Sequence, residues 1–260
     1  MTTGVVNVSV ANIYEASNYQ SQVVTQGILG EQVKIMELQS QFSLVELPDT
    51  YTGWISNYQL AEEVIGISGE PVTIRQHWIH IYQDSKTSSP VVRDAVIGSR
   101  LIKTGAENEW LRVILPDGKS GWIHESATGS FPADVQEGIK ALAGEFLGYP
   151  YFWGGRSPKG FDCSGLTQTV FGLLGVKIPR DSWKQQQAGK FITNEPTNAR
   201  AGDLYFFAED KNRITHVGIA MGDGKILHAR GYVRQNSLIK GEPDYSDELK
   251  STFIDVRSFI

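Results

Sequence analysis

The chain contains a single cysteine, Cys163, in a position that suits a nucleophile. Residues 151–160 are rich in glycine and proline and predict a loop. Apolar residues recur at helical spacing directly after it, and Asp162 occupies the position of an N-cap. We therefore expect Cys163 in the first turn of a buried helix, where unpaired N–H groups and the helix dipole lower the pKa of a thiol.

A lone cysteine in a protein of this composition is more often a small buried hydrophobic residue. A nucleophilic cysteine also needs a base, and the base needs a group that orients it. Two of the five histidines, His216 and His228, follow Cys163 in the chain and could fill these roles.

Residues 214–229 predict a β-hairpin with a Gly-Asp-Gly turn at 222–224. A three-residue loop places His228 opposite Gly218, so its side chain shares a face with that of His216. A two-residue loop would shift the register by one and put the two histidines on opposite faces. The catalytic interpretation therefore requires the three-residue turn.

The second half of the chain carries six short motifs in order. They are Gly148-Tyr-Pro-Tyr-Phe-Trp-Gly-Gly155, Phe161-Asp-Cys-Ser-Gly-Leu166, Ile178-Pro-Arg-Asp-Ser-Trp183, Arg200-Ala-Gly-Asp-Leu-Tyr-Phe-Phe207, His216-Val-Gly-Ile219 and Gly224-Lys-Ile-Leu-His-Ala229. Together they resemble the NlpC-type cysteine peptidases, which are papain-like in chemistry and cut peptides of the bacterial cell wall. The resemblance implies Cys163 as nucleophile, His216 as base and His228 as the third polar member.

Length and composition limit the other possibilities. The chain has 260 residues, 40% of them hydrophobic, enough for one large or two to three small domains. The net charge is −5 and no basic patch stands out, so nucleic acid is not an expected partner. One cysteine excludes an intrachain disulfide and a cysteine-based metal cage. We expect no metal and no cofactor.

The N-terminal sequence has neither a basic region nor a long apolar run, and no apolar segment approaches 18 residues. These features predict a protein without a membrane span that stays in the cytoplasm. A periplasmic or extracellular location is the alternative if a signal peptide has been removed. We expect a monomer.

The first half of the chain contains an internal repeat with an offset of 68 residues. Ile13-Tyr14 returns as Ile81-Tyr82, and Gly53-Trp54-Ile55 returns as Gly121-Trp122-Ile123. Short alternating stretches separated by turn residues predict two small antiparallel barrels. The repeats resemble bacterial SH3-like domains.

These observations predict three domains. Residues 1–64 form the first SH3-like barrel, residues 65–130 the second, and residues 131–260 the peptidase domain. The fold class is α+β: a papain-like NlpC-type catalytic domain, with helices against an antiparallel sheet, preceded by two small all-β barrels.

The two repeats differ at positions that matter for a substrate. Glu15 matches Gln83, and Tyr51 matches Lys119. Drift on two solvated surfaces explains any two such positions equally well. A resemblance to the γ-D-glutamyl-L-diamino acid endopeptidases nevertheless implies that Glu15 and Tyr51, together with Asp162, hold the free amine of the substrate's L-alanine.

The same resemblance implies that Ser164 and Ser182 contact the peptide around γ-D-glutamate. Arg180, between these two positions, is interpreted as a plain surface charge.

Several elements of the last domain are expected from periodicity alone. Residues 133–147 predict a helix, and residues 181–188 a short helix capped by Asp181. Strands are expected at 204–207, 214–221 and 225–229, with an edge strand at 253–256.

The sequence therefore predicts a cysteine endopeptidase that cleaves the bond between γ-D-glutamate and a diamino acid, meso-diaminopimelate or L-lysine. Its substrates are cell-wall peptides with a free N-terminal L-alanine, and its role is peptidoglycan recycling. The alternatives are an autolysin acting on intact peptidoglycan, an amidase or N-acyl transferase on the same Cys-His scaffold, and a non-catalytic wall-binding protein.

Overall fold

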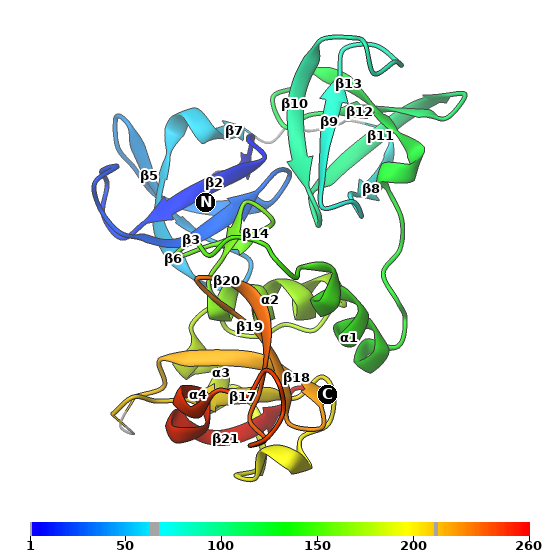
Figure 1. The fold of residues 1–260 in the computed structure, drawn as a ribbon. Coiled ribbons are helices and arrows are strands. Elements are labelled where there is room, and N and C mark those ends of the chain that lie inside the picture. Colours follow the sequence, from blue (N-terminus) through cyan, green and yellow to red (C-terminus); the bar gives the residue numbers. More distant parts are fainter. Residues whose placement is uncertain (1, 63–67, 211–212) are drawn as a thin grey trace. The chain divides into compact units, whose positions relative to one another are not determined.

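The computed structural model describes residues 2–62, 68–210 and 213–260 (Figure 1). The chain divides into two compact units, Met1–Ser130 and Phe131–Ile260. The predicted boundary between residues 64 and 65 lies outside the described residues.

The first unit contains two antiparallel sheets that follow one another along the chain. Their strand orders are β3-β2-β6-β5-β4-β1-β7 and β10-β9-β13-β12-β11-β8. The strands of the first sheet are β1 (Thr2–Val6), β2 (Val10–Tyr14), β3 (Val23–Ile28), β4 (Gln32–Leu38), β5 (Phe42–Glu46), β6 (Thr52–Ser56) and β7 (Leu60–Glu62). Those of the second are β8 (Glu70–Thr73), β9 (Trp78–Tyr82), β10 (Val91–Val96), β11 (Arg100–Glu107), β12 (Trp110–Ile114) and β13 (Ser120–His124).

The strands of the two sheets correspond to one another as the sequence repeat predicts. Four strands of the first sheet, β2, β3, β5 and β6, recur 68 residues later as β9, β10, β12 and β13, in the same order within the sheet. A Cβ added to Gly53 would lie 2.5 Å from the side chain of Ile13, and one added to Gly121 would lie 2.5 Å from that of Ile81. The repeated glycine is therefore required by the close approach of two strands.

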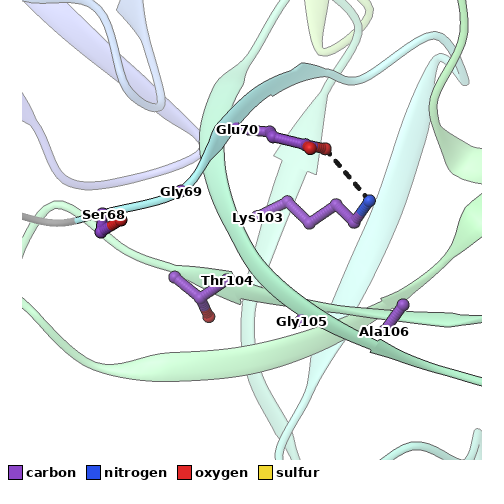
Figure 2. Close-up of a pocket in the computed structure, with 7 residues that line it drawn as sticks. All are labelled: Ser68, Gly69, Glu70, Lys103, Thr104, Gly105 and Ala106. Atoms are coloured by element: carbon purple, nitrogen blue, oxygen red, sulfur yellow. Dashed lines mark hydrogen bonds and ion pairs between the residues drawn. The ribbon is translucent and has the colours of Figure 1, made fainter.

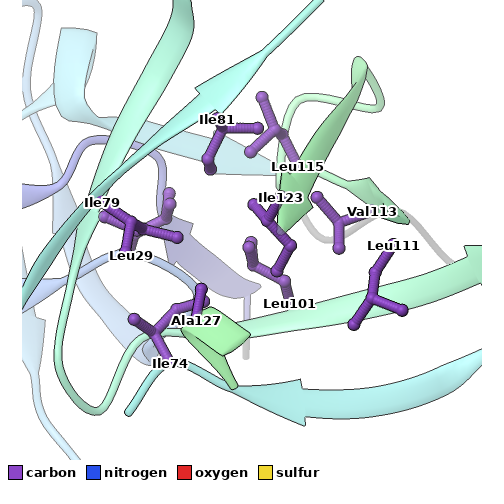
Figure 3. Close-up of a cluster of buried hydrophobic side chains, with 11 residues drawn as sticks. Leu29, Ile74, Ile79, Ile81, Leu101, Leu111, Val113, Leu115, Ile123 and Ala127 are labelled. Carbon is purple, nitrogen blue, oxygen red and sulfur yellow. The ribbon is translucent and has the colours of Figure 1, made fainter. Parts of the chain in front are cut away.

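The two repeats are joined by a shared core (Figure 3). Leu29, from the turn between β3 and β4, belongs to the buried cluster of the second repeat, where it lies beside Ile79. The Arg100 N–H donates to the Leu29 carbonyl at 3.2 Å, and Arg93 donates to the carbonyl and side chain of Asn7. These contacts explain why both repeats fall in one compact unit.

The second unit is α+β. Its sheet is antiparallel with the order β16-β21-β17-β18-β19-β20, and α2 packs against β18 and β19 (Figure 1). The strands are β16 (Lys190–Thr193), β17 (Leu204–Phe207), β18 (His216–Gly222), β19 (Lys225–Arg230), β20 (Tyr232–Ser237) and β21 (Phe253–Ser258), and a small ribbon is formed by β14 (Arg156–Ser157) and β15 (Gly160–Phe161). The helices are α1 (Val135–Glu145), α2 (Cys163–Leu173), α3 (Ser182–Ala188) and α4 (Asp247–Thr252).

Some predicted details of this unit are wrong. The strand expected at the edge, β21, lies inside the sheet and pairs with both β16 and β17. Asp181 stands at the N-cap of α3, but its side chain makes no capping bond and instead pairs with Lys184 at 3.2 Å. The strand β20 was not predicted.

The β18–β19 hairpin reaches the expected register by an unexpected route. The loop has two residues, Asp223 and Gly224, both with positive φ as a type I′ turn requires, and Gly222 pairs with Lys225. A β-bulge between Ala220 and Gly222 inserts one extra residue, so the predicted three-residue loop is wrong. Beyond the bulge the pairing is the predicted one, which leaves Gly218 opposite His228.

We predict that Gly218→Ala destabilises the second unit. A Cβ at this position would lie 2.5 Å from Ile226 and 2.9 Å from the Cβ of His228, so a strand must shift. The expected loss is about 1–3 kcal/mol of unfolding free energy, measured by urea denaturation. Gly144→Ala in α1 is the control, because nothing lies within 4 Å of the added carbon and alanine favours a helix. Equal stability of Gly218→Ala and the wild type would contradict the register.

Candidate active site

Cys163 is the first residue of α2, as predicted, and Asp162 is its N-cap. The Gly165 N–H donates to Oδ1 of Asp162 at 2.6 Å, which satisfies one of the free donors of the first turn. The Cys163 N–H belongs to the same turn, where helix geometry provides no intrahelical acceptor.

The Cys163 thiol lies beside the backbone N–H groups of Val217 and Ser164. The residue keeps some exposed surface, but protein surrounds the sulfur. Burial, followed by the negative charge of Asp162, raises the pKa of the thiol to about 12. The lowered pKa expected from the helix start is therefore wrong for the substrate-free site. The sulfur is protonated and needs a base.

The two histidines form a hydrogen-bonded pair at the start of the hairpin. Nε2 of His216 lies 2.7 Å from Nδ1 of His228, as the predicted shared face requires. His216 directly precedes Val217, whose N–H lies at the thiol, so the sulfur lies at the beginning of β18, one residue along the backbone from His216.

A third polar residue, Asn236 on β20, completes the chain of hydrogen bonds. Its Oδ1 lies 3.0 Å from Nε2 of His228, and its Nδ2 donates to the backbone carbonyl of Asp244 at 3.0 Å. Because a carbonyl can only accept, the Asn236 amide is fixed with its oxygen toward His228. Sequence reasoning missed Asn236 because it missed β20.

The network also determines the tautomers of both rings. His228 must donate from Nε2 to Asn236, which leaves its Nδ1 as an acceptor. His216 then donates from Nε2 to His228 and keeps a lone pair on Nδ1. This lone pair is the base available to the thiol.

Both imidazoles are neutral at pH 7. Burial, then the charges of His228, Arg230 and Arg234, lower the pKa of His216 well below 6.5. Burial lowers the pKa of His228 to about 4, partly offset by its hydrogen bond to Asn236. A neutral His216 is the form that can accept a proton.

Arg180 is not the predicted surface charge. It is 3% exposed and donates to both carboxylate oxygens of Asp162, at 3.0 and 2.6 Å, and to the Ser164 hydroxyl at 2.9 Å. Asp162 also accepts from the backbone N–H groups of Gly154 and Gly165. The residues on either side of the nucleophile are therefore held by one guanidinium, and the predicted contacts of Asp162 and Ser164 with substrate stay predictions.

Tyr151 is a further residue near the nucleophile. Burial, then the nearby Cys163 and Asp162, raise the pKa of its phenol to about 12, so it keeps its proton and can donate. No sequence pattern distinguishes Tyr151 from Tyr149 in the same loop.

Three predicted site residues remain. Ser182 is half-buried at the start of α3. Glu15 is exposed directly after β2, and Tyr51 is half-buried directly before β6. Glu15 and Tyr51 belong to the first unit, and their roles stay predictions. Within the described ranges no group of three or more His, Cys, Asp or Glu side chains is arranged to hold a metal ion. No described helix has the length and apolar character needed to cross a membrane.

An open pocket of about 390 Å³ lies on the second repeat (Figure 2). Glu70 and Lys103 form an ion pair of 3.2 Å at its side. Its lining contains no cysteine or histidine, so it offers none of the chemistry described above.

Comparison with known families matches both parts of the chain. A model described as the NlpC/P60 family matches residues 148–247, and one described as a bacterial SH3 domain matches residues 9–61. The first repeat is thus SH3-like, and the assignment of the second as an SH3 domain stays a proposal.

Three named proteins are similar over most of the chain. Two are named gamma-D-glutamyl-L-lysine dipeptidyl-peptidase. The Bacillus subtilis protein is 32% identical, covering 80% of this chain and 72% of its own length. The Bacillus cereus protein is 28% identical, covering 88% and 74%. The dipeptidyl-peptidase 6 of Lysinibacillus sphaericus is 29% identical, covering 95% and 96%.

The crystal structure of an NlpC/P60 family protein from Bacillus cereus has the same fold. Its TM-score is 0.85 over 99% of both chains, at 23% identity.

We predict that stability falls as the pH falls from about 6.5 to about 4, partly because of His228. The unfolded histidine gains a proton near pH 6.5, whereas the folded one gains it only near pH 4. The unfolded state therefore binds more protons in this window, and up to about 3 kcal/mol of stability is lost as the pH falls through it. Urea denaturation of wild type and His228→Gln between pH 4 and pH 8 measures the effect.

His228→Gln should show a smaller loss of stability over that window. Asn194→Ala, which replaces an exposed residue without a titratable group, is the control and should keep the wild-type slope. Identical slopes for all three proteins would refute the assignment of a buried neutral His228.

Proposed function

This chain belongs to the NlpC/P60 family and is a peptidase, and we propose that it hydrolyses the bond between γ-D-glutamate and a diamino acid. Its substrates are cell-wall peptides with a free N-terminal L-alanine. The reaction serves peptidoglycan recycling in the cytoplasm, and the enzyme acts as a monomer.

One observation carries the catalytic part of this proposal. A buried cysteine at a helix start lies at the first residues of β18, where His216 is held in one tautomer by His228 and Asn236. A nucleophile, a base and an oriented partner are the minimum for covalent acyl transfer. An amidase or acyl transferase could use the same groups, so the proposed substrate is supported by the similarity to named relatives and not by these groups.

The first half-reaction forms a thioester. The Cys163 sulfur attacks the γ-carbonyl carbon of glutamate while Nδ1 of His216 takes the thiol proton. The carbonyl oxygen becomes an oxyanion, for which the Cys163 backbone N–H and the Tyr151 hydroxyl are the candidate donors. The His216 imidazolium then gives its proton to the amine of the diamino acid, the C–N bond breaks, and the amine leaves.

The second half-reaction uses water. His216 accepts a proton from a water molecule, whose oxygen attacks the thioester carbon. The C–S bond breaks, the sulfur recovers the proton from His216, and the dipeptide leaves as a carboxylic acid that ionises. His228 stabilises the transient imidazolium of His216 by accepting its Nε2–H throughout.

The substrate is supported by the names of two relatives. Both are called gamma-D-glutamyl-L-lysine dipeptidyl-peptidase, which describes release of a dipeptide from an N-terminus. We infer the same class of peptide for this chain. Turnover of the two tripeptides described next distinguishes L-lysine from meso-diaminopimelate as the preferred diamino acid.

The assay offers purified protein L-Ala-γ-D-Glu-L-Lys, its diaminopimelate counterpart, the N-acetylated tripeptide and intact crosslinked peptidoglycan. Mass spectrometry identifies the products. We expect L-Ala-γ-D-Glu and a free diamino acid from the unblocked tripeptides. Release of fragments from intact peptidoglycan, with the tripeptides left uncut, would favour the autolysin. Absence of turnover on every peptide would refute the proposal.

Substitutions along the hydrogen-bonded chain should give graded losses of kcat. Cys163→Ala and His216→Ala should remove nearly all turnover, because nucleophile and base are lost. His228→Ala and Asn236→Ala should leave more, because only the orientation of His216 is affected. Initial rates with the free tripeptide measure the series, and Asn194→Ala on the exposed surface is the control. Wild-type turnover by His216→Ala would refute its role as base.

We predict that Glu15→Gln lowers kcat/KM for the free tripeptide by about tenfold to a hundredfold. A carboxylate bound to an ammonium group contributes a charge-assisted hydrogen bond of that size. The N-acetylated tripeptide should be a still poorer substrate of the wild type. Gln83→Ala, the matched position of the second repeat, is the control and should change little. If Glu15→Gln cleaves the free tripeptide as fast as the wild type, the free-amine requirement does not involve the first repeat.

A further inference from the structure

Arg234 lies beside the histidine pair. It is directly opposite His228 in the β19–β20 ladder, and directly opposite residues of neighbouring strands share a face. Asn236, two residues further along β20, lies on that face as well and bonds His228. Arg234 therefore lies beside His228, on the same strand and face as Asn236.

The guanidinium of Arg234 has unused hydrogen-bonding capacity. No hydrogen bond or ion pair joins its side chain to another residue of the described chain, and its Nε is buried without a partner. Its one described side-chain contact is with the ring of Tyr232, 5.6 Å from the guanidinium carbon. A half-buried cation without an acceptor costs free energy, which a bound anion would recover.

Other arginines of the same unit do have carboxylate partners. Arg180 is neutralised by Asp162 at 2.6 Å, and Arg230 pairs with Glu248 at 2.5 Å. Arg230 and Arg234 both lie close enough to the histidines to lower their pKa values. Of these two charges near the base, only that of Arg234 lacks a carboxylate in the described chain.

We propose that Arg234 binds the α-carboxylate of the residue released from the substrate, which rests on the proposed function. His216 must contact the departing amine to protonate it. In a tripeptide, the carbon that bears this amine also bears a free carboxylate, so the anion lies within a few bonds of His216. A planar guanidinium with paired donors matches a carboxylate in geometry and charge.

This assignment makes Arg234 a specificity residue. A peptide that ends at the diamino acid presents the carboxylate, whereas an amidated or extended peptide presents a neutral amide at the same place. The enzyme should therefore favour tripeptides with a free C-terminus. Loss of one charge-assisted hydrogen-bonded contact corresponds to about tenfold to a hundredfold in kcat/KM.

The test compares L-Ala-γ-D-Glu-L-Lys with the same peptide carrying a C-terminal carboxamide, at pH 8, where His216 is neutral in every variant. The wild type should prefer the free acid by at least about tenfold. Arg234→Gln should lose about tenfold to a hundredfold on the free acid and change little on the carboxamide, which abolishes the preference. Arg234→Lys should retain part of it, and thermal denaturation checks that both variants fold.

Arg230→Gln is the matched control, because it also removes a positive charge near the histidines but one that Glu248 already neutralises. It should keep the wild-type preference between the two peptides. Equal cleavage of both peptides by the wild type overturns the proposal, as does an equal loss on both in Arg234→Gln. If the wild type cleaves neither peptide, the proposed function itself fails.

Discussion

The site depends on a single extra residue in the β18–β19 hairpin. Side chains alternate between the faces of a strand, so a shift of one residue moves His228 to the other face. The two-residue turn at Asp223 and Gly224 would by itself give the wrong register, and the bulge between Ala220 and Gly222 corrects it. Gly218 then allows the strands to approach at the position opposite His228. Asn236 and Arg234 share this face with His228 through the separate β19–β20 register, in which His228 lies opposite Arg234.

The electrostatics of the site favour neutral reacting groups before substrate binds. The same burial that raises the pKa of Cys163 lowers that of His216, so the proton remains on sulfur. The nearby charges add to this, since Asp162 opposes a thiolate and Arg230 and Arg234 oppose an imidazolium. Arg180 works in the opposite direction by neutralising Asp162. Proton transfer therefore has to be coupled to attack on the carbonyl, where the oxyanion donors can compensate the new charge.

The sequence was sufficient for the parts of the site that depend on local pattern. The helix start at Cys163 follows from its N-cap and apolar periodicity. Strand alternation predicted a shared face for the two histidines only with a three-residue loop, and the structure reaches that register by a two-residue turn and a bulge. Arg180 could not be recognised, because its burial arises from an ion pair with Asp162 across two loops. Asn236 was missed with its strand. The predicted lowering of the Cys163 pKa was wrong. A helix start in the sequence indicates the stabilising dipole but not how deeply the thiol is buried, and burial has the larger effect on the pKa here.

The repeat shows why matched residues need not have matched functions. Leu29 is inserted into the core of the following repeat, and a Cβ on the adjacent Gly30 would lie 1.8 Å from the Arg100 carbonyl oxygen. The equivalent of Leu29 in the second repeat is Ile97. Residues 68–130 contain no third repeat into whose core Ile97 could insert. The two copies therefore have the same strands, but the turn that carries Leu29 packs against a following repeat and the turn that carries Ile97 does not. A difference such as Glu15 against Gln83 is therefore compatible with a role in one copy only, and the family model that matches the first copy is consistent with that divergence.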